Sequence, residues 1–237
     1  MNKIAVFLTA SVLAASTVWA SGHGWSYEST HWGGVCDSGQ QQSPIDITNA
    51  QSANLPPISF DYKDSTLKLV DNGHTLQAIY APGSGITVDG KRYELLQFHF
   101  HKPSEEKVNG QASDMVIHLV HKAADGKLAV VAVLLKQGAA NPVVEKLWSH
   151  WPQGSKETEF KETINASQLL PDASNRGYFT FAGSLTTPPC TEGLTWFVLK
   201  TAQSISPEQL VRFSKSYPNN ARPTQPINTR VIKVSSF

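Results

Sequence analysis

The chain of 237 residues has 20 basic and 19 acidic side chains, a formal net charge of +1 at pH 7, and 40% hydrophobic residues. This balance is typical of a folded globular protein and excludes a largely disordered or fibrous chain. The near-neutral charge offers no basic excess for nucleic acid or an anionic membrane, so we expect neither as a partner. The length suits one domain.

The first 20 residues have the features of a signal peptide. Lys3 precedes a largely apolar stretch, residues 4–18, which is too short to span a bilayer comfortably. Compact residues ending at Ala20 then suit a signal peptidase. We expect cleavage after Ala20, a mature domain over residues 21–237 with no membrane span, and secretion. The alternative, an apolar core segment, is disfavoured by the flanking residues.

Secretion bears on the two cysteines, Cys36 and Cys190. An even pair in a chain that enters an oxidising compartment predicts a disulfide. A structural zinc site would need closely spaced cysteines, which this pair lacks.

Short segments rich in β-branched and aromatic residues recur along the chain and predict strands. They cover residues 66–70, 75–80, 93–101, 115–121, 128–135, 177–181 and 194–199. Asp71-Asn72-Gly73 and Asp125-Gly126 predict hairpin turns between them.

Two helix starts stand out near the end of this series. Asn141-Pro142 combines a cap with a proline in the first turn, and Ser206-Pro207-Glu208-Gln209 is a capping box. The fold class expected is therefore mainly β, mixed with some α: a single domain with a large, mostly antiparallel central sheet and short peripheral helices.

The segment Gln97-Phe98-His99-Phe100-His101 carries the strongest chemical signal. Successive side chains of a strand point to opposite faces. His99 and His101 therefore share one face, while Phe98 and Phe100 point into a core. Two imidazoles held in this way form a pair of metal ligands.

A third ligand is expected from residues 115–121, where His118 and His121 lie three apart and so face opposite ways. At most one can join the pair, and periodicity does not choose between them; with His118 inward, Val120 shares its face. The two strands are expected to be antiparallel neighbours. Three imidazoles favour catalytic zinc, although copper and iron also bind them. The alternative is a set of hydrogen-bonded structural histidines.

With these residues in view, the chain resembles the α-carbonic anhydrases over nearly the whole mature length, and their bacterial periplasmic branch in particular. The resemblance rests on short motifs in a specific order: Trp25-Ser26-Tyr27, His31-Trp32-Gly33, Gln42-Ser43-Pro44-Ile45-Asp46-Ile47, Asn72-Gly73-His74, Gln97 to His101, Ser104-Glu105, His118-Leu119-Val120-His121, Gly183-Ser184-Leu185-Thr186-Thr187-Pro188-Pro189-Cys190, Thr195-Trp196, and Asn220 with Arg222-Pro223.

The resemblance implies that His99, His101 and His118 bind Zn²⁺ within a large twisted sheet. It also implies reversible hydration of carbon dioxide to bicarbonate and a proton through a zinc-bound hydroxide, in the periplasm. The expected partner is this small-molecule substrate, and the protein is expected to be a monomer or homodimer.

The resemblance also implies roles for residues other than the metal ligands. Thr186 would accept a hydrogen bond from the hydroxide and donate to Glu105, and His74 would carry the proton to solvent. The alternative is a purely structural role for each residue: Thr186 would be part of a rigid turn, and His74 would be an ordinary histidine of a surface loop. An apolar wall for carbon dioxide, whose members could equally be ordinary core residues, would comprise Val120, Val130, Leu185, Thr187 and Trp196.

The ligand rings also need acceptors for their other N–H groups. Gln97 suits His99, and a backbone carbonyl near Asn220 suits His101. The family usually has a Glu two residues before the third ligand, often paired with a His after the Ser-Glu motif, but Val116 and Glu106 stand at those positions here. We therefore hypothesise that Glu106 itself accepts from His118.

The sequence disfavours two other classes of protein. A binding module that keeps the fold without turnover would usually lose a ligand histidine, and all three are present. Another zinc hydrolase is disfavoured because the His-Glu-x-x-His pattern of metalloproteases is absent from the sequence.

Overall fold

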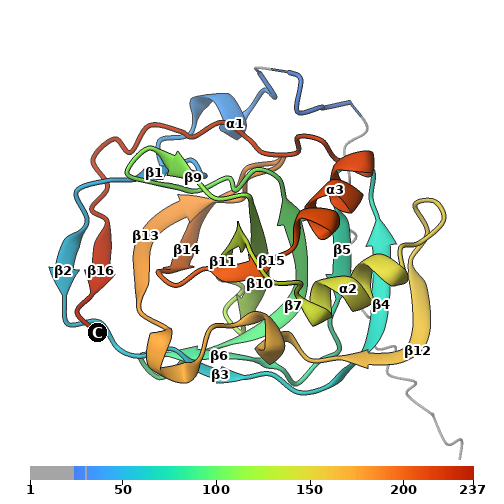
Figure 1. The fold of residues 1–237 in the computed structure, drawn as a ribbon. Coiled ribbons are helices and arrows are strands. Elements are labelled where there is room, and N and C mark those ends of the chain that lie inside the picture. Colours follow the sequence, from blue (N-terminus) through green and yellow to red (C-terminus); the bar gives the residue numbers. More distant parts are fainter. Residues whose placement is uncertain (1–23, 30) are drawn as a thin grey trace, which may run out of the picture.

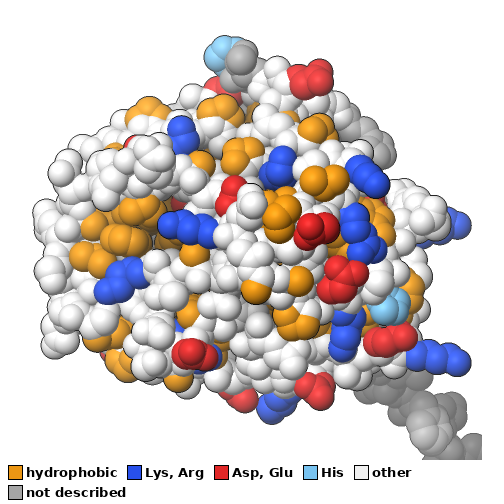
Figure 2. All heavy atoms as spheres, in the orientation of Figure 1, with side chains coloured by type: hydrophobic (Ala, Val, Ile, Leu, Met, Phe, Trp, Pro, Cys, Tyr) orange, Lys and Arg blue, Asp and Glu red, His pale blue; other side chains and the backbone are white. Residues whose placement is uncertain are grey.

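The computed structural model describes residues 24–29 and 31–237. The predicted signal peptide, residues 1–20, lies outside the described residues. Within the described part, no helix is long and apolar enough to cross a membrane. Acidic and basic side chains are intermixed on the face shown in Figure 2, as the near-zero net charge predicts.

A large mixed sheet dominates the fold (Figure 1). The described residues form a 13-stranded sheet whose main path runs β12-β4-β5-β7-β10-β11-β14-β13-β16-β2, with β15, β3 and β6 attached beside it. The path strands are β12 (Thr158–Ile164), β4 (Ser65–Asp71), β5 (Leu76–Ile79), β7 (Lys91–His101), β10 (Met115–Ala123), β11 (Leu128–Gln137), β14 (Glu192–Leu199), β13 (Tyr178–Ser184), β16 (Lys233–Ser235) and β2 (Gln51–Ala53).

The remaining strands are short. β15 (Gln203–Ile205) pairs with β11, β3 (Ser59–Asp61) pairs with β6 (Gly85–Val88), and a small separate sheet holds β1 (Asp46–Ile47), β8 (Lys107–Val108) and β9 (Gln111–Ala112). Most pairs are antiparallel, and β11 runs parallel to β14 and β15. The predicted mainly β, single-domain fold with a mostly antiparallel sheet is confirmed.

All seven predicted strand segments are strands, with ends that differ by a few residues. The sequence patterns did not predict the other strands, which are β1, β2, β3, β6, β8, β9, β12, β15 and β16. β12 lies at one end of the main path and is largely exposed, so its residues need no regular alternation of apolar side chains.

Both predicted helices are present as α2 (Pro142–Ser149) and α3 (Pro207–Ser216). The Asn141 side chain accepts hydrogen bonds from the first turn of α2, and Ser206 and Gln209 form the reciprocal capping box of α3. The two helices lie side by side, with the indole N–H of Trp148 donating to the carbonyl of Gln209 at 3.0 Å (Figure 1). The single-turn helix α1 (Val35–Ser38) and the 3₁₀ turns η1 (Ala166–Leu169) and η2 (Ala173–Asn175) were not predicted.

The predicted turn at Asp71-Asn72-Gly73 connects β4 and β5. The side-chain oxygen of Asn72 accepts from the backbone N–H groups of His74 and Thr75, both at 2.9 Å. Gly73 has φ of 82°, a conformation that glycine adopts without strain. His74 therefore sits on a turn that its own neighbours close.

Alternation along β7 separates the two faces of the sheet as expected. Phe98 and Phe100 are 0% exposed and belong to the larger hydrophobic core, where Phe100 meets Trp148 edge-on with ring centroids 4.8 Å apart. A smaller cluster, which includes Val120, Val130 and Trp196, is distinct from this core. The histidines of β7 therefore lie on the face of the sheet opposite the larger hydrophobic core.

We predict that Phe98→Ala lowers the free energy of unfolding by about 3–5 kcal/mol, because it leaves a cavity in the larger core. Urea unfolding monitored by tryptophan fluorescence measures this. Val211→Ala is the control, since Val211 is 60% exposed on α3. A loss at position 98 no larger than the control's would contradict the assignment of this face to the core.

Candidate metal centre

Three histidines converge at the centre of the sheet. β7 and β10 pair antiparallel with His118 directly opposite His99, and His101 lies two residues further along β7. One ring nitrogen from each of His99, His101 and His118 lies within 4.8 Å of the others. Adjacent strands therefore bring the histidine pair of β7 together with a third histidine from β10.

His121 does not join them. The ladder between β10 and β7 shifts register between Val120 and His121, and His121 is 0% exposed, with its Nε2 2.8 Å from the hydroxyl of Tyr62. The ambiguity that periodicity left between His118 and His121 is thus resolved by the structure in favour of His118.

Each ligand ring is oriented by an acceptor for its other nitrogen. His99 Nδ1 donates to Gln97 Oε1 at 2.8 Å, and His101 Nδ1 donates to the backbone carbonyl of Asn220 at 2.8 Å. His118 Nε2 lies 3.0 Å from Glu106 Oε2. These contacts leave His99 Nε2, His101 Nε2 and His118 Nδ1 free to coordinate a common ion.

The residues fit a metal ion. His101 Nε2 is buried and has no hydrogen-bond partner among the described residues, which is costly for a polar atom unless something coordinates it. Three imidazole nitrogens, each with a fixed acceptor behind it, are a donor set suited to zinc in an open catalytic site.

Burial sets the protonation of two ligands. It lowers the pKa of His99 to about 3 and holds that of His101 well below its ordinary value, with the neighbouring histidines adding to both shifts. Both rings are therefore neutral at pH 7, the form that binds metal. Burial also lowers the pKa of His118, but the charges of Glu106 and Glu105 outweigh it and raise the pKa overall.

Glu105 lies against the rings of His101 and His118. Its Oε1 accepts from the backbone N–H of Arg222 at 2.8 Å, and its Oε2 is 3.5 Å from His101 Nε2 and 3.7 Å from His118 Nδ1. Burial raises the pKa of this carboxyl to about 8, although nearby His118, the backbone N–H of Arg222 and the side chain of Thr186 each act to lower it. A cation held by the histidines would favour the ionised carboxylate.

The smaller hydrophobic cluster borders the same site. Val120, Val130 and Trp196 are register partners across β10, β11 and β14, and the Trp196 ring meets the His118 ring edge-on at 4.9 Å. Leu185 packs against this cluster while partly exposed. Thr187 is half-buried, and its carbonyl accepts from the N–H of Cys190 at 2.9 Å. This hydrogen bond closes the turn that positions Thr187.

His74 lies on its turn beside an aromatic group from the N-terminal segment. Its ring stacks on Trp25, with centroids 3.9 Å apart and planes at 12°. Partial burial lowers the pKa of His74 from its ordinary value. Trp25 was missed as a neighbour of this residue because nothing in the sequence connects the two positions.

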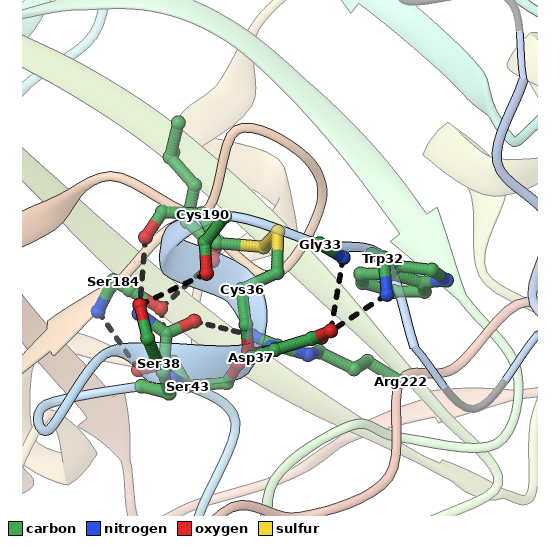
Figure 3. Close-up of a disulfide and its surroundings, with 12 residues drawn as sticks. Trp32, Gly33, Cys36, Asp37, Ser38, Ser43, Ser184, Cys190 and Arg222 are labelled. Atoms are coloured by element: carbon green, nitrogen blue, oxygen red, sulfur yellow. Dashed lines mark hydrogen bonds between the residues drawn. A yellow bond between two sulfur atoms is a disulfide. The ribbon is translucent and has the colours of Figure 1, made fainter.

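The predicted disulfide is present between Cys36 and Cys190, which are 154 residues apart in sequence (Figure 3). Cys190 ends the loop that begins at Thr186. Arg222, which is 6% exposed, donates to the carbonyls of Cys36 and Ser43, both at 2.7 Å. The same residue's backbone N–H holds Glu105, a role that the sequence analysis missed.

Comparison with known proteins defines the family. Residues 23–236 match the eukaryotic-type carbonic anhydrase family. A carbonic anhydrase of Klebsiella pneumoniae is 43% identical over 241 residues, covering 94% of this chain and 96% of that protein. One from Nostoc sp. is 42% identical over 215 residues, covering 85% of this chain and 81% of that protein.

Solved structures agree. A hyperthermostable carbonic anhydrase identified from an active hydrothermal vent chimney matches with a TM-score of 0.83 and 41% identity, over 85% of this chain and 90% of that one. The α-carbonic anhydrase of Thermovibrio ammonificans, solved with the inhibitor sulfanilamide, gives a TM-score of 0.80 at 41% identity, over 85% and 89%. The fold and the histidine centre are those of a metalloenzyme. The chain belongs to the α-carbonic anhydrase family.

We predict that the double substitution Cys36→Ser, Cys190→Ser lowers the free energy of unfolding by up to about 5 kcal/mol, because opening so long a loop restores entropy to the unfolded chain. Urea unfolding under non-reducing conditions measures the loss. Ser38→Ala is the matched control, since Ser38 is exposed on the same short helix. A double variant as stable as this control would count against a stabilising role for the disulfide.

Proposed function

We propose that this protein is a zinc-dependent carbonic anhydrase that catalyses the reversible hydration of carbon dioxide to bicarbonate and a proton. The observation that carries the proposal is the centre itself. Three neutral or carboxylate-backed imidazoles aim one nitrogen each at a common point, beside an apolar cluster and a buried Thr186–Glu105 pair. Membership of the family adds the substrate.

His99 Nε2, His101 Nε2 and His118 Nδ1 would hold the zinc ion. When bound there, zinc supplies a Lewis acid that makes water acidic enough to ionise near neutral pH, a property for which carbonic anhydrase is the standard example. Gln97, Glu106 and the Asn220 carbonyl keep the three rings in the tautomer and orientation that coordination needs.

Thr186 and Glu105 orient the attacking oxygen. With Glu105 ionised, the hydroxyl of Thr186 would donate to this carboxylate, which would leave the lone pairs of Thr186 to accept from a protonated oxygen in the site. The backbone N–H of Arg222 holds the other carboxylate oxygen in place. This arrangement selects an oxygen nucleophile that carries a proton and aligns it for attack.

Carbon dioxide is apolar and is best received by an apolar surface. Val120, Val130, Leu185 and Trp196 provide one next to His118, with Thr187 at the adjoining turn. The side chains of Val120, Val130 and Leu185 offer no hydrogen bond, and the indole N–H of Trp196 is already bound to the carbonyl of Ser184, so a charged bicarbonate would be poorly held on this wall.

His74 would move the product proton to solvent. A histidine suits this task because its pKa lies near neutrality, and the lowered pKa of His74 favours release of the proton once it is taken up. The half-buried position of the ring on an exposed turn gives it access to water.

The site of action would be the periplasm. The signal-peptide features of residues 1–20 support export, and the Cys36–Cys190 disulfide suits an oxidising compartment.

We predict that the mature protein, residues 21–237, binds one equivalent of zinc and hydrates carbon dioxide rapidly, and that His118→Ala loses both properties because a ligand is removed. Stopped-flow hydration and metal analysis on the same sample test this. The control is His31→Ala, whose side chain is 83% exposed. A folded, zinc-loaded wild type without hydration activity would instead indicate a binding module.

A separate prediction concerns Glu106. Replacement by Ala removes the acceptor behind His118, so the affinity for zinc should fall about 10–100-fold and zinc should dissociate faster. Transfer of zinc to a chromogenic chelator measures the rate, with Glu159→Ala as control because the Glu159 side chain is 62% exposed. Unchanged dissociation from Glu106→Ala would show that this contact does not stabilise the metal.

A further inference from the structure

Asn220 is 1% exposed, and every polar group it carries is hydrogen-bonded. Its backbone carbonyl accepts from His101 Nδ1 at 2.8 Å, and its backbone N–H donates to the carbonyl of Lys102 at 3.0 Å. These two bonds fix the residue against the end of β7, where the metal ligands stand.

The side chain of Asn220 reaches in two further directions. Its Oδ1 accepts from the N–H of Lys102 at 2.7 Å, and its Nδ2 donates to the carbonyls of Phe100 and His74, both at 2.9 Å. One amide group thus connects the end of the ligand strand to the turn that carries His74, although Asn220 and His74 are 146 residues apart in sequence.

Other contacts hold the base of the same turn, while Trp25 stacks on the His74 ring and Asn220 binds the His74 carbonyl. Asp71 accepts from the indole N–H of Trp151 at 2.8 Å and from the hydroxyl of Tyr217. Thr75 Oγ1 donates to the carbonyl of Phe100 at 2.6 Å. Among the described residues, the hydrogen bond that reaches the His74 backbone from outside this turn is the one donated by the Asn220 side chain.

We propose that the side chain of Asn220 is a positioning residue that fixes His74 relative to the metal ligands and so sets the rate of proton transfer to solvent. The proposal rests on the proposed function, because it requires His74 to carry the proton. Proton relay falls steeply when donor and acceptor are displaced, so the backbone of a relay residue must be held.

The chemistry of the side chain explains why asparagine is needed. An amide offers an acceptor for Lys102 and two N–H donors for the two carbonyls. Aspartate keeps the shape and the bond from Lys102 but directs an oxygen at both carbonyls. Alanine removes all three bonds and keeps the backbone carbonyl that orients His101.

The test compares Asn220→Ala and Asn220→Asp with His74→Ala, in the mature zinc-loaded enzyme. Asn219→Ala is the control, because Asn219 is the exposed neighbour. Stopped-flow hydration in dilute, non-transferring buffer gives kcat and kcat/KM, and added imidazole supplies an external proton carrier. Zinc content and amide exchange of Lys102 report on the site without activity.

For both Asn220 variants we expect kcat to fall about tenfold in dilute buffer, while kcat/KM for carbon dioxide changes less than about twofold. Imidazole should restore kcat, zinc content should remain complete, and the Lys102 amide should lose protection in Asn220→Ala only. His74→Ala should show the same pattern of loss and rescue.

Two outcomes would overturn the proposal in distinguishable ways. Wild-type kcat in both Asn220 variants, with His74→Ala impaired, would leave the relay intact and reject Asn220 as its positioning residue. Parallel loss of kcat, kcat/KM and zinc would assign Asn220 to the metal site alone. If His74→Ala keeps the wild-type kcat in dilute buffer, His74 does not carry the proton, and both the relay role and the positioning role of Asn220 are rejected. Should Asn220→Ala not fold, the near-isosteric Asn220→Asp decides between these outcomes.

Discussion

The pleat of β7 is the constraint on which the centre depends. A strand must send successive side chains to opposite faces, so burying Phe98 and Phe100 in the larger core forces His99 and His101 onto the other face. The two rings cannot slip by one residue without exchanging aromatic groups for imidazoles in the core. Pairing with β10 then places His118 directly opposite His99. Hydrophobic packing on one face thereby sets the geometry of polar chemistry on the other.

Loops from distant parts of the chain complete what the strands begin. Glu105 and Glu106 follow β7, with Glu105 beside the coordinating nitrogens of His101 and His118 and Glu106 at the other nitrogen of His118. Arg222 and Asn220 come from the C-terminal segment, and Cys36 is bonded to Cys190. Burying such groups is unfavourable unless each finds partners. The contacts of Arg222 with three carbonyl oxygens and of Asn220 with five neighbouring groups meet this requirement, and they also tie the site's separate pieces together.

Where the chain departs from the usual family pattern, the structure shows a compensating contact. Val116, at the position where a Glu is common, is 0% exposed in the smaller apolar cluster. Glu106 comes instead from the loop after β7 and places its carboxylate 3.0 Å from His118 Nε2. A carboxylate behind the third ring is thus retained from a different element, since what the ring needs is an acceptor at one nitrogen.

The sequence alone determined whatever depends on local pattern: seven strands of the central sheet, the Asn72-Gly73 turn, the two capped helices and the shared face of His99 and His101. These follow from alternation, turn chemistry and capping within a few residues. The tertiary structure decided which of His118 and His121 joins the pair, because that depends on strand register and on a bulge. It also decided the roles of Trp25, Arg222 and the Asn220 side chain, whose partners lie 49 or more residues away. Contacts at such separations arise only when the whole chain has folded, so no local pattern records them.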